Sequence, residues 1–212
     1  MNIYFDTEFT GLVPNTTLIS IGCVAESGEK FYAEFTDYDR NLVDSWCREN
    51  VIKNLYLKKD PNKSSGLVTY DSDKGLYEVK GDTHTVRKYI TDWLEFELLH
   101  KPGTDPKRRI QFVSDVCHYD FYLLCNQIFG GAFTLPSNVN PACYDICQDI
   151  GIAMYKEAKP FDLSVAMDVG FNYSREAFLK DVLCEELPSG RKHNSLYDAE
   201  VIKMIYEEMR RV

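Results

Sequence analysis

Two acidic residues stand in the first apolar segment of the chain, and their spacing limits how that segment can fold. The segment from Ile3 to Phe9 is rich in apolar and aromatic residues and predicts a β-strand. Side chains alternate between the two faces of a strand, so Asp6 and Glu8 point to the same side. Two carboxylates there repel each other and lose hydration, and both effects are unfavourable unless a positive group lies between the carboxylates. A divalent cation would fit, because hard cations bind carboxylate oxygens. The alternative is a frayed strand end with solvated acids.

The composition is that of an ordinary globular protein of 212 residues. It has 44% hydrophobic and 27% charged residues, and no apolar run approaches the roughly 20 residues that span a bilayer. We see no signal peptide, and the seven cysteines form no C-x-x-C pair; we therefore expect a cytoplasmic protein with free thiols and no membrane contact. The net charge of −9 argues against broad binding of duplex nucleic acid. It does not exclude an enzyme that holds one strand end.

The remaining pattern predicts a single α/β domain over residues 1–212. Short connections between the first three strands indicate an antiparallel meander, and later strands alternate with helices that would cover the sheet. The expected strands are 3–9, 17–25, 30–35 and 109–114, and the expected helices are 83–99, 120–129, 174–183 and 195–211. The helix from residue 83 has one apolar stripe, which consists of Val86, Ile90, Trp93 and Leu94. Residues 40–57 look partly helical, with Trp46 and Val51 among the apolar anchors. Residues 58–82 predict an inserted hairpin or loop, and residues 142–159 contain a strand or a helix.

A third acid stands at the start of the middle helix. On a helix Asp120 shares one stripe with Leu123, Leu124 and Gln127, so its carboxylate faces the core. The competing interpretation is a helix N-cap, since an acid near a helix start is stabilising by about 0.3–1 kcal/mol. Asp115 is a second acid nearby that could take the place of Asp120.

The fourth acid lies in the closing helix, shortly after a histidine. Asp198 aligns with Ile202 and Ile205 on the apolar stripe of that helix. The alternative is a capping box, in which Ser195 caps the helix and pairs with Asp198. His193 precedes the helix, where its imidazole could lie beside a metal ligand. A surface or packing role is the alternative for this histidine.

Together these signals resemble the DEDDh-type 3′–5′ exonucleases, DnaQ-like proteins with a ribonuclease H-like fold. The segment Asp6–Leu12, DTEFTGL, is similar to the first motif of the family. Tyr119 and Asp120 are similar to the second motif, and His193–Asp198 is similar to the third, H-x(4)-D. Within the family, the first strands most resemble the mycobacterial-type 3′–5′ exoribonucleases. The resemblance implies a mixed five-stranded sheet, an antiparallel meander plus parallel strands, flanked by helices.

The resemblance also implies a chemistry. The family hydrolyses phosphodiester bonds from the 3′ end of single-stranded RNA or a 3′ overhang and releases nucleoside 5′-monophosphates. It implies two Mg²⁺ or Mn²⁺ ions, a histidine general base and a homodimer. The residues concerned are Asp6, Glu8, Asp120 and Asp198 for the metals, His193 for the base, and Thr7, Phe9 and Leu12 for nucleic acid. For Phe9 and Leu12, core packing is the alternative. The rival functions are a 3′–5′ exodeoxyribonuclease of the same fold and a catalytically silent nucleic-acid-binding module.

Overall fold

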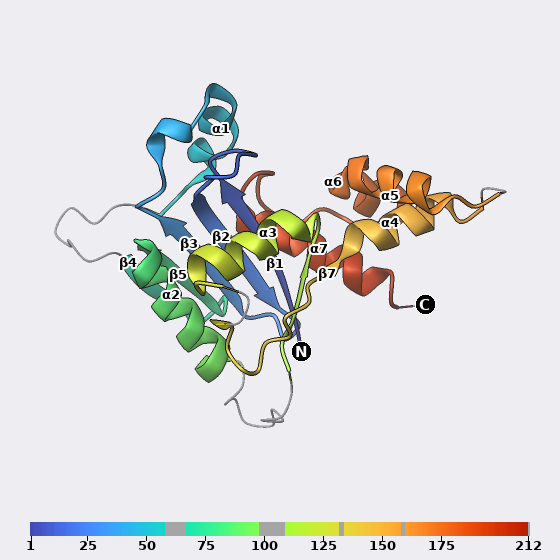
Figure 1. Ribbon diagram of the computed structural model, residues 1–212. Helices are drawn as coiled ribbons and strands as arrows, with labels where there is room; N and C mark the ends of the chain where they lie inside the picture. The colour runs from blue at the N-terminus through green and yellow to red at the C-terminus, as the bar shows by residue number, and fades with distance from the viewer. Residues whose placement is uncertain (58–66, 98–108, 132–133, 158–159, 212) are drawn as a thin grey trace.

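The computed structural model describes residues 1–57, 67–97, 109–131, 134–157 and 160–211 (Figure 1). Within these ranges the strands form one mixed sheet of seven strands, in the order β4-β5-β3-β2-β1-β6-β7. The strands are β1 (Asn2–Phe9), β2 (Leu18–Ala25), β3 (Lys30–Phe35), β4 (Leu67–Asp71), β5 (Leu76–Gly81), β6 (Gln111–Ser114) and β7 (Tyr144–Asp145). β1, β2 and β3 pair antiparallel, which confirms the predicted meander. β6 is parallel to β1, and β7 is parallel to β6.

The predicted number of five strands is wrong, because β4 and β5 extend the sheet. These two strands pair antiparallel, and β5 then pairs parallel with β3, opposing Val79 to Ala33. Val79 is fully buried, so β5 contributes to the core as well as to the sheet. Residues 58–66 of the predicted insertion lie outside the described residues. That one domain spans 1–212 stays a prediction.

Helices lie on both faces of the sheet, with α2 and α3 on one face and α7 on the other (Figure 1). The α-helices are α1 (Ser45–Asn50), α2 (Thr83–Asp92), α3 (Cys117–Leu123), α4 (Ile146–Tyr155), α5 (Leu163–Asn172), α6 (Arg175–Ala177) and α7 (Ser195–Glu208). Shorter helical turns are η1 (Arg40–Leu42), η2 (Ile52–Asn54), η3 (Trp93–Glu97), η4 (Leu124–Ile128) and η6 (Phe178–Val182). Among the described residues, no helix is both apolar and long enough to traverse a bilayer.

Several helix boundaries differ from the predictions. The middle helix begins at Cys117 instead of Asp120 and continues through η4. The ambiguous segment 142–159 contains both a strand and a helix, since β7 leads directly into α4. None of the predicted helices covers α5. Glycines lie where α5 packs on α4, and because glycine has a low helix propensity, they weaken the pattern that would indicate a helix. A Cβ on Gly170 would lie 1.9 Å from the carbonyl oxygen of Cys147, so the two helix backbones are in contact.

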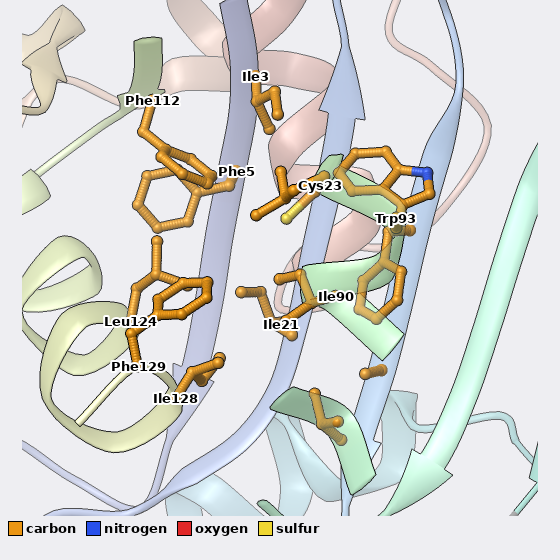
Figure 2. Close-up of a cluster of buried hydrophobic side chains, with 14 of the residues drawn as sticks. Ile3, Phe5, Ile21, Cys23, Ile90, Trp93, Phe112, Leu124, Ile128 and Phe129 are labelled. Carbon is orange, nitrogen blue, oxygen red and sulfur yellow. The ribbon is translucent and has the colours of Figure 1, made fainter. Parts of the chain in front are cut away.

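The main core lies between the sheet and the face formed by α2, η3 and η4. Figure 2 shows Ile3 and Phe5 of β1 among side chains from these helices. The stripe predicted for the helix after residue 83 is confirmed, since its four members are buried: Val86, Ile90, Trp93 and Leu94. On the opposite face, Tyr4 of β1 packs in a second cluster with residues of α4 and α7. The same alternation that separates these clusters directs Asp6 and Glu8 towards α7.

Candidate active site

The two acids of β1 lie beside small residues of β2. Asp6 is paired with Gly22 and Glu8 with Ser20 in the β1–β2 register. The register shifts between Glu8 and Phe9, where Ile19 is an extra, unpaired residue on β2. Small neighbours on β2 leave the space above these carboxylates open to another element.

That element is the first turn of α7. A Cβ on Gly22 would lie only 2.3 Å from the backbone nitrogen of Leu196, so only glycine allows α7 to start directly on β2. The hydroxyls of Ser20 and Ser195 are hydrogen-bonded at 3.0 Å across the same contact. This close approach brings Asp198, three residues into the helix, to the acids of β1.

Asn194 caps α7, because its side chain accepts a hydrogen bond from the Tyr197 backbone N–H. The alternative interpretation, a capping box at Ser195, is therefore wrong. Asp198 instead accepts the backbone N–H of His193 at 2.8 Å. This bond keeps the histidine against the helix that carries the acid.

His193 faces the acids of the site. Its Nδ1 lies 3.8 Å from Oε1 of Glu8. Ligand atoms of Glu8, His193 and Asp198 all lie within 4.8 Å of one another, close enough to bind one metal ion. Burial, helped by the nearby charge of Lys192, lowers the pKa of His193 below its ordinary 6.5, so the imidazole is mainly neutral at pH 7.

Asp120 reaches the site from the other face of the sheet. It lies inside the first turn of α3, which follows Val116, so the N-cap interpretation is wrong. One of its carboxylate oxygens accepts both the backbone N–H of Thr7, at 2.9 Å, and the Thr7 hydroxyl. Thr7 lies between Asp6 and Glu8 on β1 and is buried. Its hydrogen bonds therefore fix the orientation of the Asp120 carboxylate.

Asp115 lines the same cleft but has a different partner. Its Oδ2 accepts a hydrogen bond from Nε of Arg175 at 2.7 Å. Arg175 is itself held by the backbone carbonyl oxygens of Gly170 and Phe171. The two competing acids therefore differ: Asp120 is attached to β1, and Asp115 is neutralised by a cation from α6.

The four acids predicted for the metals all have raised pKa values. Burial is the largest cause for each, and repulsion from neighbouring carboxylates adds to it. The pKa is about 8 for Asp120 and about 7 for Asp198, and it lies well above the ordinary range for Asp6 and Glu8. The cleft therefore favours added positive charge, either a proton or a cation.

Comparison with known proteins agrees with these motifs. No family model matches the chain. Two proteins named 3′–5′ exoribonuclease, from the H37Rv and CDC 1551 strains of Mycobacterium tuberculosis, are each 42% identical to it over 139 residues. The match covers 66% of this chain and 67% of each relative. The chain belongs to this exoribonuclease family. The resemblance found from three short motifs is confirmed.

Aromatic side chains form part of the walls of the cleft in this family member. The cleft has a volume of about 480 Å³. Phe9 stacks on Tyr119 with 6.0 Å between ring centroids, and Phe9 also packs against the main core. Leu12 is 69% exposed at the same cleft, so the core-packing alternative fails for Leu12 and holds in part for Phe9. Phe171, at the end of α5, is half-exposed and lines the cleft as well.

Sequence reasoning did not find three of these contacts. The Thr7 hydroxyl on Asp120, the pairing of Arg175 with Asp115, and the position of Phe171 all join distant parts of the chain. No local pattern marks such contacts. The one sequence feature that indicated an aromatic residue at the cleft was Tyr119, which stands next to Asp120 in the second motif.

Proposed function

We propose that this protein is a metal-dependent 3′–5′ exoribonuclease that releases nucleoside 5′-monophosphates from single-stranded RNA or a 3′ overhang. The observation that supports this most is the convergence of four carboxylates, one buried and three partly buried, and one neutral imidazole in a single cleft. The proposal includes a ribonuclease H-like fold for the mixed sheet, one catalytic domain over residues 1–212 and a homodimer.

The donor set fits divalent cations. Asp6, Glu8, Asp120 and Asp198 offer carboxylate oxygens, which Mg²⁺ and Mn²⁺ prefer. Their raised pKa values mean that the site is short of positive charge. These four residues would hold the two ions. When bound, such ions stabilise charge on the phosphate and ease the deprotonation of water.

His193 would act as the general base. Its lowered pKa keeps the imidazole in the form that accepts a proton at neutral pH. Nδ1, which faces Glu8, is the atom that we expect to receive the proton. Asp198 stabilises the backbone of His193 and thus the position of this nitrogen.

The cleft suits the end of a single strand. The rings of Phe9, Tyr119 and Phe171 line it and offer faces on which bases can stack, at roughly 1–3 kcal/mol per base. Leu12, exposed at the same cleft, would contact the terminal nucleotides, and Thr7 would orient Asp120 behind them. RNA is favoured over DNA because the relatives are named exoribonucleases.

The test is a gel with 5′-labelled single-stranded RNA and DNA of the same sequence. We expect a ladder that shortens from the 3′ end with Mn²⁺ or Mg²⁺, disappears with EDTA, and forms faster on RNA. Asp6→Ala should abolish the ladder, whereas Asp73→Ala, at an exposed acid in the β4–β5 turn, should leave it unchanged. Faster DNA cleavage would favour an exodeoxyribonuclease. No ladder from the folded protein would favour a silent binding module.

A further inference from the structure

We propose that Trp46 and Asn54 are positioning residues that hold His193 in place for catalysis. The inference rests on the proposed function, in which His193 is the general base. Both residues belong to the segment that contains α1 and η2, here called the brace (residues 45–57). Figure 1 shows α1 at the end of the sheet where β1 ends.

His193 has a backbone conformation that needs support. Its φ of 62° lies in the left-handed region, which residues other than glycine rarely adopt. Such a conformation persists where the surrounding contacts enforce it. Asp198 supports one side by accepting the His193 backbone N–H. A second contact, on the other side of the loop that contains His193, would add to this support.

Asn54 supplies the contact on that other side. Its side-chain amide donates to the backbone carbonyl oxygen of Lys192 at 2.8 Å and lies 3.4 Å from that of His193. Asn194, which follows the histidine, donates in return to the backbone carbonyl oxygen of Asn54 at 3.3 Å. Lys192 and His193 are thus bound to the side chain of Asn54, and Asn194 is bound to its backbone.

Trp46 contacts the imidazole itself. The two rings meet edge to face, with centroids 5.0 Å apart and planes at 77°. Trp46 was predicted to be an apolar anchor, but it is 54% exposed, which is unusual for so large an apolar side chain. Its ring thus limits the rotation of the His193 side chain and does little to stabilise the core.

The brace is attached firmly enough to act as a support. Cys47 of α1 and Val51, the residue after this helix, are buried against Ile19 of β2. Beyond η2, the buried carboxylate of Glu34 accepts the backbone N–H of Leu57 at 2.8 Å. Both ends of the brace are therefore fixed to the central sheet, so that Trp46 and Asn54 cannot move freely with the histidine loop.

The rival explanation is that Trp46 contacts RNA directly. A double-mutant cycle separates the two roles, with initial rates measured at varied RNA concentrations for Trp46→Ala, His193→Ala and the double variant. The same cycle is made with Asn54→Ala. The matched controls are Trp46→Phe, which keeps a ring edge, and Asn41→Ala, at an exposed asparagine outside the brace.

We expect Trp46→Ala and Asn54→Ala each to lower kcat by roughly 10- to 100-fold with little change in KM, because a small misplacement of a catalytic group is costly. In the His193→Ala background neither change should lower kcat further, since the group that they position is gone. Trp46→Phe should recover most of the rate, and Asn41→Ala should behave as wild type. Circular dichroism and melting curves would check that each variant is folded.

Different failures have different meanings. If wild type degrades RNA and His193→Ala is slow, but the double variants are slower still, then Trp46 and Asn54 act independently of His193 and the inference is wrong. A rise in KM alone for Trp46→Ala would make it an RNA contact, which also overturns the inference. If wild type has no exonuclease activity, the proposed function fails, and the inference fails with it.

A second readout does not depend on turnover. The chain has two tryptophans, of which Trp93 is buried in the main core. If the imidazole contacts Trp46, His193→Ala should change the tryptophan emission of wild type but not that of Trp46→Phe. Unchanged emission in both would contradict the ring contact on which the positioning role depends.

Discussion

Each carboxylate of the cleft has a distinct set of contacts that governs its ionisation. Asp120 is 5% exposed and accepts two hydrogen bonds from Thr7, yet burial still raises its pKa to about 8. Because this value exceeds the ordinary 3.8, the folded protein binds more protons than the unfolded chain between those pH values. In the metal-free protein, Asp120 therefore destabilises the folded state increasingly as the pH rises from about 4 to about 8.

Asp120→Asn should separate stability from activity. The amide keeps a carbonyl oxygen that can accept the hydrogen bonds from Thr7, but it has no charge to desolvate. At pH 8 in EDTA, we expect the melting temperature to rise by a few degrees, at roughly 2–4 °C per kcal/mol for a chain of this size. With metal, RNA hydrolysis should fall by about 100-fold or more.

Asp115→Asn is the matched control for that measurement. It removes the charge that pairs with Arg175, so the melting temperature in EDTA should fall. Scanning fluorimetry of the two variants at pH 8 would compare them directly. A lower melting temperature for Asp120→Asn would show that its charge is stabilising in the folded protein, contrary to the argument from burial.

Among the secondary-structure elements, α7 has the largest part in assembling the site. Its first turn contacts β2 at Gly22, and its residue Asp198 accepts the backbone N–H of His193. β1 contributes through the alternation of its side chains, which presents Asp6 and Glu8 to the helix. The distance between α7 and the sheet thus decides whether the acids and His193 form one site.

Gly22→Ala should disturb this distance. The new methyl group would lie 2.3 Å from the backbone of Leu196, so α7 must shift away from β2. Overpacking of this kind typically costs about 1–3 kcal/mol. A shift of about 1 Å at the site would lower kcat roughly 100-fold.

Ser20→Ala, on the same strand face, loses one hydrogen bond without a clash and should cost about 1 kcal/mol or less. Urea unfolding and RNA turnover would measure both; a Gly22→Ala protein with normal rate and stability would contradict the packing argument.

For the whole molecule, the net charge of −9 and the acidic cleft make the free energy of unfolding depend on both the pH and the bound metal. The raised pKa values of Asp120 and Asp198 place the relevant window between pH 4 and 8. The pKa of His193 lies below 6.5, so its protonation contributes little above that pH. Above pH 6.5 the carboxylates therefore dominate the dependence that arises from this site.

The metal-free protein should lose stability between pH 6.5 and 8.5, and Mn²⁺ should restore it. The restored part should be larger at pH 8.5, because fewer protons then compete for the carboxylates. Melting temperatures in EDTA and in millimolar Mn²⁺ at both pH values would measure this. In Asp6→Asn the effect of Mn²⁺ should be small. An equal gain from Mn²⁺ at both pH values would contradict the coupling between protons and metal at this cleft.

Much of the site was predictable because its signals are local. The two-residue spacing of Asp6 and Glu8 and the helical stripe through Asp198 each depend only on the period of one element. The predicted helix stripe of residues 83–94 and the meander of the first three strands were correct for the same reason. In contrast, the sheet has seven strands among the described residues and not five, since the pairing of β5 with β3 joins residues far apart in sequence.

The sequence by itself determined which residues are candidates for the site: the face of β1 with its two acids, the acid-bearing stripes, and the motifs that place the chain in its family. Only the tertiary structure decided how these residues are held. Asp120 is oriented by Thr7, Asp115 is neutralised by Arg175, and His193 lies between Asp198 and the brace. The physical reason is that each of these contacts depends on how separate elements pack, and here a single glycine on β2 sets the distance of α7 from the sheet.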